Sequence, residues 1–301
     1  MAVFDSYLLK RVACQARLAR VREAWRYALV RPRERKRFHV VSMERNAGPS
    51  AIRCLESVYR QHYDRALVRH VFIDDASTDG TDERIERWLR DHPDSSVQYV
   101  HNTDRLGSGA NGPRGSRMAE PGSIVIEVDG DDWLPDHRVL SFFDRVYEDP
   151  EVWMTYNTAM KYKNGRYRRP SAQWRQPYPA EVIARNEVRY HPVDRLGHPR
   201  TYRIELFHQV PPQYLTDPNT GEPWLYARDK ALFFPMMELA GTHARHVYRV
   251  CYVYDISQRW AVTDADARAC DEIRRLPPCA PLDSLPPPDP APRHRQPQQP
   301  S

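Results

Sequence analysis

The sequence lacks the features that would place the chain across a membrane or in a secretory pathway. No uninterrupted apolar run approaches the ~20 residues that a membrane-spanning helix needs, and the mean hydropathy is −0.76. No compact apolar segment follows the first basic residues, so we expect no signal peptide. The five cysteines are scattered and include no CxxC pair. We therefore expect reduced thiols in a cytosol-like compartment, without a zinc site or a disulfide framework.

Positive charge is concentrated in residues 1–37, which hold eleven Lys or Arg against three acidic residues. Apolar residues recur near helical spacing from Phe4 to Leu29, which predicts a basic amphipathic helical arm. Two interpretations stay open: a helix packed on the domain with a solvated basic face, or an interfacial helix on an anionic membrane. No nucleic-acid-binding motif accompanies this charge, so we expect no nucleic-acid partner.

Proline is concentrated at the other end. Residues 276–301 hold ten of the 27 prolines. Such a composition predicts a disordered, partly polyproline tail rather than a packed segment. We expect 261–301 to be a short helix followed by this tail.

Between these ends, about 38–150 alternates strands with helices. Strands are predicted over 38–43, in "VRHVFIDD", in "SSVQYVHN" and in "IVIEV", and helices over 49–61, "DERIERWLRDH" and "HRVLSFFDRVY". A glycine-rich loop, "DRLGSGANGPRGS" (104–116), precedes a further helix. This alternation predicts an α/β fold with a mostly parallel sheet and helices on both faces. In such sheets, ligands bind outside the carboxyl ends of the strands.

Aspartates gather where two of these strands end. Asp74 and Asp75 end one strand, and Asp129, Asp131 and Asp132 follow another. Helix capping explains one carboxylate per turn, not three within four residues. A divalent cation explains the rest, because Mg²⁺ or Mn²⁺ takes one or two protein carboxylates and completes its shell with substrate phosphates and water. The implied ligand is a nucleoside diphosphate.

"IDDASTDGT", followed about fifty residues later by "GSIVIEVDGDDWLPD", resembles the nucleotide-sugar glycosyltransferases of family 2, which have the GT-A fold. The resemblance is clear over 38–150 and looser over 150–260. It implies a GT-A, Rossmann-like domain at 38–260. Its first half, 38–150, would bind the nucleotide-sugar, and its second half, 151–260, would bind the acceptor.

The resemblance implies roles for the aspartates. Asp75 would contact the nucleobase, and Asp129 would lie near the ribose or the sugar. Asp131, together with Asp132, would hold Mn²⁺ or Mg²⁺ on the diphosphate of the donor.

Two further segments resemble parts of the family. The glycine-rich loop aligns with one that faces the diphosphate-sugar, which makes Asn111 and Arg114 candidates. "HPRTYR" resembles a segment that would place His198 and Arg200 at the donor phosphates or the acceptor. An ordinary surface loop remains the alternative for 195–207.

A transferase of this kind also needs a base for the acceptor hydroxyl. In the family it is an Asp or Glu at the start of a helix about a hundred residues beyond the Asp-x-Asp (DXD) element, which here would be Asp129-Gly130-Asp131. Asp229 in "WLYARDKALFFPMMELAG" fits, and a helix N-terminus would keep its carboxylate ionised. A plain helix cap or a salt bridge to Arg228 or Lys230 is the alternative, and Glu238 is the second choice of base.

The family's first strand usually ends Pro-Thr-Tyr-Asn, whereas this one reads Met43-Glu44-Arg45-Asn46, so base preference cannot be transferred. The expected function is an inverting, metal-dependent glycosyltransferase in glycan or glycoconjugate synthesis. Its acceptor would be a glycan, a lipid-linked sugar or a protein, and the chain would be cytoplasmic or peripherally membrane-bound. Two alternatives stay open: a non-catalytic nucleotide-sugar-binding protein, and a nucleotidyltransferase, although "ERNAGPS" has only one glycine.

Overall fold

The computed structural model describes residues 18–257 and 263–288. The strands are β1 (Phe38–Glu44), β2 (Val68–Asp74), β3 (Val97–His101), β4 (Ile124–Glu127), β5 (Met154–Lys163), β6 (Arg166–Arg168), β7 (Thr201–Arg203) and β8 (Ala244–Asp255). The helices are α2 (Pro49–Tyr59), α3 (Thr81–Asp91), α4 (Ser108–Arg117), α5 (Val139–Val146), α6 (Ala180–Ala184), α7 (Ile204–Phe207), α8 (Arg228–Ala240) and α9 (Asp264–Arg275). A further helix covers 18–28. No described helix has the length and hydrophobicity of a membrane span.

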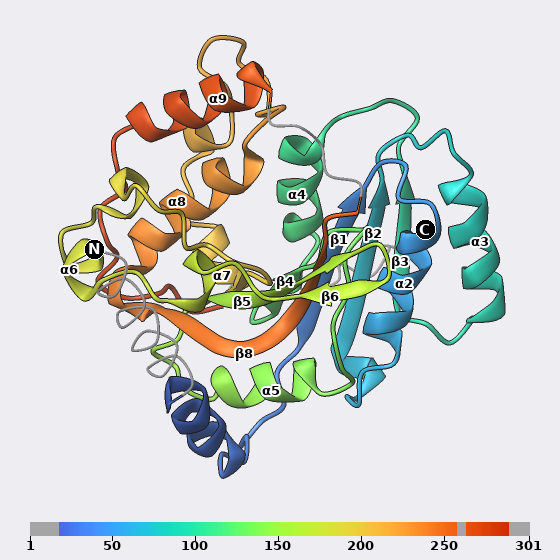
Figure 1. Ribbon diagram of the computed structural model, residues 1–301, viewed down its shortest axis with the longest axis horizontal. Coiled ribbons are helices and arrows are strands. Elements are labelled where there is room, and N and C mark those ends of the chain that lie inside the picture. Colours follow the sequence, from blue (N-terminus) through green and yellow to red (C-terminus); the bar gives the residue numbers. More distant parts are fainter. Residues whose placement is uncertain (1–17, 258–262, 289–301) are drawn as a thin grey trace, which may run out of the picture.

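All eight strands form one sheet, in the order β3-β2-β1-β4-β7-β5-β6, with β8 paired to β5 (Figure 1). β1 lies parallel to both β2 and β4, and β2 lies parallel to β3. β7 runs antiparallel between β4 and β5. This sheet, mostly parallel in its core and surrounded by helices, confirms the predicted α/β fold class.

The alternation of side chains along β1 explains why helices cover both faces. Phe38 and Val40 join a hydrophobic cluster with residues of α2, α3 and α5. Val41 and Met43 point the other way, into a cluster with α8 and α9. Successive side chains of a strand point to opposite faces, so an apolar run such as this one is stable only when both faces are covered.

Helix α4 forms inside the stretch that we expected to be a glycine-rich loop. Three of its glycines recur every third residue, and a Cβ atom on any of them would collide with a neighbour. It would lie 1.8 Å from the Trp224 carbonyl oxygen at Gly109, 2.6 Å from Arg228 Nη1 at Gly112, and 2.5 Å from Val41 Cγ1 at Gly115. The glycines therefore let the α4 backbone lie directly against β1 and the start of α8, which offsets their low helix propensity.

The predicted disorder of the Pro-rich tail is wrong for residues 276–288, and the remaining tail lies outside the described residues. Leu276, Leu282 and Leu285 pack on the core beside α8. The Leu282 N–H donates to the Leu239 carbonyl oxygen (2.9 Å). Proline fixes an extended backbone that needs no partner strand, so the interspersed leucines can dock without regular secondary structure.

Two histidines are buried within the parallel strands. His39 Nε2 lies 2.9 Å from the Gly115 carbonyl oxygen, and His70 Nε2 lies 2.9 Å from Ser42 Oγ. Burial lowers the pKa of His39 to about 4 and that of His70 to about 3. Both are therefore neutral in the folded protein at neutral pH, whereas they gain a proton below pH ~6.5 once unfolded.

The two histidines should accordingly lower the unfolding free energy as the pH falls from about 6.5 to 4, by up to ~1.4 kcal/mol per pH unit for each. His70→Gln cannot be protonated, so its unfolding free energy, measured with urea at several pH values, should fall less, or rise more, than that of the wild type as the pH drops. His208→Gln, at an exposed histidine, should keep the wild-type slope. An unchanged slope in His70→Gln would contradict the assignment.

Candidate active site

The two aspartate-bearing strands flank β1, so their carboxyl ends meet at one edge of the sheet. A cavity of about 380 Å³ opens at this edge. Its lining includes six of the residues singled out in the sequence: Asp75, Asn111, Asp129, His198, Arg200 and Asp229. It also includes residues that the sequence analysis did not propose as ligand-binding or catalytic, among them Glu44, Arg105, Arg228 and Tyr254.

Asp75 lies at the end of β2 and organises the loop before α4. Its carboxylate accepts hydrogen bonds from Asn102 Nδ2 (3.0 Å), the Leu106 N–H (2.8 Å) and the Gly107 N–H (2.8 Å). Burial on its own raises the pKa of Asp75, but these bonds stabilise the anion and lower the pKa below its usual value. The cavity wall here therefore carries a fixed negative charge.

Asn111, in α4, is fully buried yet lines the cavity. Its Oδ1 accepts from Asn102 Nδ2 (3.0 Å), while its Nδ2 makes no hydrogen bond of normal geometry in the described part of the chain and lies on the side of Asp75, whose pKa the Asn111 side chain lowers. An unpaired buried donor costs free energy, so this amide could donate to a ligand oxygen. Arg114 lies one turn further on, outside the cavity lining, and donates to Asn102 Oδ1 (2.8 Å). Arg114 therefore does not line the cavity, and instead it fixes Asn102 by a hydrogen bond.

Asp129 faces a cation that sequence reasoning missed. Arg228, at the start of α8, is buried, with its Nη1 2.8 Å from Glu127 Oε2 and its Nη2 3.7 Å from Asp129 Oδ1. His198 Nδ1 lies 3.6 Å from Asp129 Oδ2. Burial raises the pKa of Asp129, against the opposing charges of Arg228 and Arg200. A guanidinium group therefore stands between two carboxylates at the cavity wall.

Asp229 follows Arg228 in the first turn of α8 and is surrounded by positive charge. Its Oδ2 lies 3.3 Å from Arg200 Nη2 and 3.9 Å from Lys230 Nζ. Burial raises the pKa of Asp229, but Lys230, Arg200 and Arg228 together lower it to about 2. Its side chain is still 36% exposed, toward the cavity. Asp229 is thus an accessible carboxylate that is ionised at neutral pH.

Glu238, the second choice of base, does not lie in the cavity. It is fully buried three turns along α8, where its carboxylate is paired with the buried Arg189 and accepts the Cys279 N–H (2.9 Å). This contact fastens α8 to the segment after α9. The sequence interpretation failed because the spacing of carboxylates along a helix does not reveal which face turns inward.

Asp132 is engaged in holding the sheet together. It has no exposed surface, and its two oxygens accept hydrogen bonds from Tyr252 Oη (2.7 Å) and the Asp255 N–H (2.6 Å) of β8. Its burial and these bonds turn the Asp132 carboxylate toward β8. The sharing of a metal by Asp131 and Asp132 stays a prediction, and of the two only Asp131 lines a cavity.

The carboxylates around Asp131 have the chemistry of a divalent cation site. Burial and the nearby charge of Asp129 raise the pKa of Asp131 to about 7, and burial and the charge of Asp131 raise the pKa of Glu44 to about 8. Both residues line a neighbouring cavity of about 120 Å³. Raised pKa values of this kind indicate carboxylates that lack a nearby positive charge. Hard oxygen ligands on a cavity rim suit Mg²⁺ or Mn²⁺.

Within the described residues, no three His, Cys, Asp or Glu side chains are arranged to bind a metal by themselves. A cation at Asp131 would therefore need further oxygens from a bound ligand. Mg²⁺ sites in nucleotide enzymes are commonly of this type, with one or two carboxylates and the substrate phosphates.

Residues 32–210 match the sequence model of glycosyl transferase family 2. Because the match covers more than half of the 301 residues, the chain belongs to this family. The resemblance noted in the sequence is confirmed, and membership of this family favours a glycosyltransferase over the nucleotidyltransferase alternative. No protein with a curated description matches the sequence.

Solved glycosyltransferase structures have the same GT-A fold. S. aureus TarS 1-349 in complex with UDP-GlcNAc is 19% identical, with a TM-score of 0.54 over 75% of this chain and 59% of that one. PcManGT, a mannosyltransferase from Pyrobaculum calidifontis in complex with GDP-Man and Mn²⁺, is 23% identical, with a TM-score of 0.53 over 83% and 70%. GalNAc-T7 with UDP, GalNAc and Mn²⁺ is 14% identical, with a TM-score of 0.58 over 80% and 48%. The chain thus spans less than two thirds of TarS 1-349 and of GalNAc-T7.

The buried pair of Arg228 and Glu127 should behave as a coupled unit. Arg228→Met leaves a buried carboxylate without its partner, so we expect a loss of about 3–5 kcal/mol in unfolding free energy. The double variant Glu127→Gln/Arg228→Met removes both charges and should lose less than the two single variants combined, as measured by urea unfolding in a double-mutant cycle.

Arg249→Gln is the matched control, because its pair with Asp136 is partly exposed. It should cost less than about 1 kcal/mol. Strict additivity of the Glu127 and Arg228 variants would contradict the coupling.

Proposed function

We propose that the chain is an inverting, metal-dependent glycosyltransferase that moves a sugar from a nucleoside-diphosphate sugar to an acceptor hydroxyl. The observation that carries the proposal is the composition of one cavity. It joins an unpaired amide donor at Asn111, guanidinium groups at Arg200 and Arg228, and an ionised carboxylate at Asp229, with Asp131 beside it. Solved structures of similar fold, crystallised with UDP-GlcNAc, GDP-Man or UDP, support the donor class.

The donor would bind along the edge formed by β1, β2 and β4. Asp75 accepts hydrogen bonds at the nucleoside end, and the Asn111 amide donates to an oxygen of the diphosphate or the sugar. Arg200 and His198 face the phosphates or the acceptor, and Asp129 faces the ribose or the sugar. Arg114 takes an indirect part by holding Asn102, which in turn hydrogen-bonds both Asp75 and Asn111.

Asp131 would hold a divalent cation, Mn²⁺ or Mg²⁺, with the remaining oxygens supplied by the donor diphosphate and water. When bound, such a cation offsets the negative charge that develops on the departing diphosphate. The two neighbouring structures that contain Mn²⁺ favour this assignment. Asp131 lies close enough to Glu44 to raise the pKa of Glu44, so the same cation would relieve both carboxylates.

Asp229 would act as the base. The acceptor oxygen forms a bond to the anomeric carbon while the bond from that carbon to the diphosphate oxygen breaks. The hydroxyl proton passes to Asp229, and the nucleoside diphosphate leaves. A carboxylate with a pKa of about 2 cannot deprotonate an alcohol beforehand, so the proton moves as the new bond forms. A single displacement of this kind inverts the anomeric centre.

The acceptor class remains part of the proposal: a glycan, a lipid-linked sugar or a protein hydroxyl. A lipid-linked acceptor would bring the chain to a membrane surface. We place the reaction in glycan or glycoconjugate synthesis, with residues 1–37 as the membrane-facing part of the chain.

Asp131→Asn should abolish metal-dependent release of nucleoside diphosphate from UDP-, GDP- or dTDP-sugars. We expect a loss of roughly a hundredfold or more, because charge stabilisation by a metal is worth several kcal/mol. EDTA should have the same effect on the wild-type chain, and Mn²⁺ should restore it. The rates are measured by quantifying the released nucleoside diphosphate.

Asp136→Asn serves as the control, since Asp136 is in the same segment but is exposed and paired with Arg249. It should keep wild-type rates. If no donor is hydrolysed and calorimetry finds no metal-dependent nucleotide affinity, the transferase proposal is wrong. Nucleotide affinity without turnover would favour the non-catalytic binding protein.

Asp229→Asn should slow the chemical step by about 10²–10⁴-fold while leaving donor affinity within a few-fold of wild type. The amide keeps the shape of the side chain but cannot accept the proton. Turnover is measured as nucleoside-diphosphate release, and affinity by titration calorimetry. Asp217→Asn, at a partly exposed loop aspartate outside the cavity, should change neither. A variant that turned over at the wild-type rate would rule out Asp229 as the base.

A further inference from the structure

The helix at 18–28 is attached to the domain by its polar side. Glu23 accepts hydrogen bonds from the backbone N–H groups of Tyr248 (3.0 Å) and Arg249 (2.7 Å) in β8. Tyr27 is buried and packs edge-on against Phe142 of α5 at a ring separation of 5.5 Å. These contacts fix the rotation of the helix, and therefore decide which of its side chains face outward.

The outward face is the apolar one. Leu18 is 53% exposed, Val21 49%, Trp25 69% and Leu29, just past the helix, 81%. At about 100° per residue, these four positions fall on one stripe, on the side opposite Tyr27. A helix that only packed on the domain would turn this stripe inward. A contiguous exposed apolar surface that includes a tryptophan marks an interaction site.

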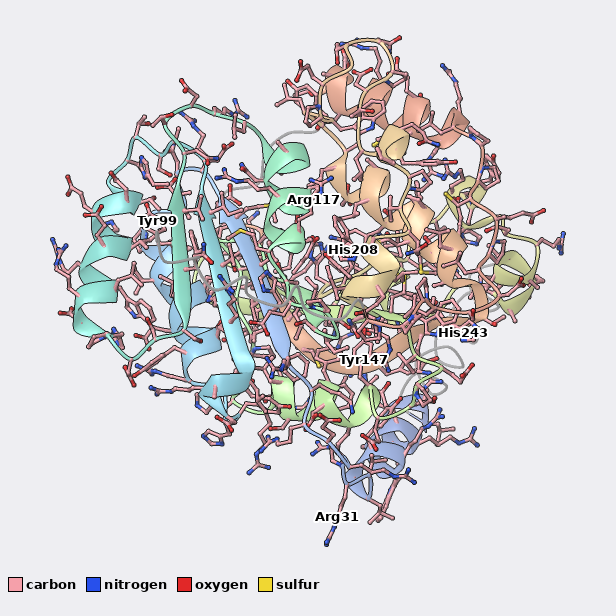
Figure 2. The ribbon with its side chains drawn as sticks, turned by 180° about the vertical axis from the view of Figure 1, so that it is seen from behind. Arg31, Tyr99, Arg117, Tyr147, His208 and His243 are labelled. Carbon is pink, nitrogen blue, oxygen red and sulfur yellow. The ribbon has the colours of Figure 1, made fainter. Side chains whose placement is uncertain are left out.

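Positive charge borders the stripe. Arg22 lies next to it on the helix, and a groove of about 640 Å³ between the helix and β8 is lined by Arg22, Arg26 and Arg245. Arg31 is exposed just beyond the helix, and Figure 2 shows it pointing away from the body of the protein. Arg33 is also exposed. The surface therefore combines an apolar centre with guanidinium groups at its margins.

We propose that this face, formed by Leu18, Val21, Trp25 and Leu29, docks on the surface of a bilayer that contains anionic lipids. Apolar side chains with a tryptophan enter the boundary between headgroups and acyl chains, while arginines pair with lipid phosphates. Charge complementarity favours an anionic bilayer over a second copy of the chain, since two copies would bring their arginine margins together. Docking through this face does not depend on glycosyl transfer, so an inactive site would leave it intact.

The test is co-sedimentation of the full chain with vesicles, one set of phosphatidylcholine alone and one of equal parts phosphatidylcholine and phosphatidylglycerol. We expect binding to the anionic vesicles and little to the zwitterionic ones. Trp25→Glu and Leu29→Glu should each reduce binding by about tenfold or more, because each replaces a membrane-buried side chain with a charge. Glutamate is a good helix former, so far-UV circular dichroism should be unchanged.

Arg22→Gln should weaken binding to anionic vesicles by about fivefold, the contribution of one basic residue near such a surface. Tyr190→Glu is the matched control, since Tyr190 is 53% exposed but lies outside this face. It should bind like wild type. Asp131→Asn should also bind like wild type, which separates docking from catalysis.

Three results with vesicles would overturn the proposal: no binding of the wild-type chain to anionic vesicles, equal binding to both vesicle types, or wild-type binding by Trp25→Glu and Leu29→Glu. A concentration-dependent dimer in light scattering that Trp25→Glu dissociates would also overturn it, because a second copy would then cover the stripe.

Discussion

The buried contact between Arg228 and Glu127 joins the parts of the chain that build the site. Glu127 ends β4, the strand that leads into the aspartates, and Arg228 begins α8 some hundred residues later. A guanidinium group can be buried at this position only because two carboxylates surround it. Once Arg228 is in place, the next residue, Asp229, lies at the cavity wall, and Asp129 has a counter-charge. The position of the proposed base is therefore set by this buried ion pair.

The glycines of α4 make this contact reachable. A side chain at Gly109 or Gly112 would push away Trp224 or Arg228, and the start of α8 would then be too far from β4 for the ion pair to form. Poor helix formers are thus used in a helix because close approach matters more than propensity at that point. The same helix carries Asn111 into the cavity with its amide donor unpaired. Electrostatic pairing and backbone proximity act together at one edge of the sheet.

In the absence of a ligand, the buried charges of the site cost free energy. Asp131 and Glu44 have raised pKa values because they are buried beside other carboxylates. The pKa of Asp229 is lowered to about 2 by three nearby cations, Lys230, Arg200 and Arg228. A cavity that has carboxylates without a counter-charge in one region and a group of cations in another is suited to a ligand that brings both a cation and phosphates. This is how perturbed pKa values and ligand binding are commonly related at functional sites.

Much of the fold was predictable from local pattern, because strands β1 to β4 and their helices are short, strongly periodic and adjacent in the sequence. The acidic edge was predictable for the same reason: parallel strands end on one side. Local pattern failed for α4, whose glycines suggest a loop, and for 276–288, whose prolines suggest disorder. In both cases the deciding contacts come from residues far away in the chain. Arg228 was missed as a site residue, although a lone Glu127 within the buried run "IVIEV" is a signal that a cation must lie nearby.

The sequence by itself determined the family, the parallel core of the sheet and the edge at which the aspartates gather, since these follow from short motifs and their order. Only the tertiary structure decided which carboxylates are available. It engaged Asp132 in binding β8 and Glu238 in binding Arg189, and it left Asp131 and Asp229 accessible at the cavities. It also turned the apolar stripe of the N-terminal helix outward. Burial and pairing depend on which distant segments meet, and no local spacing encodes that.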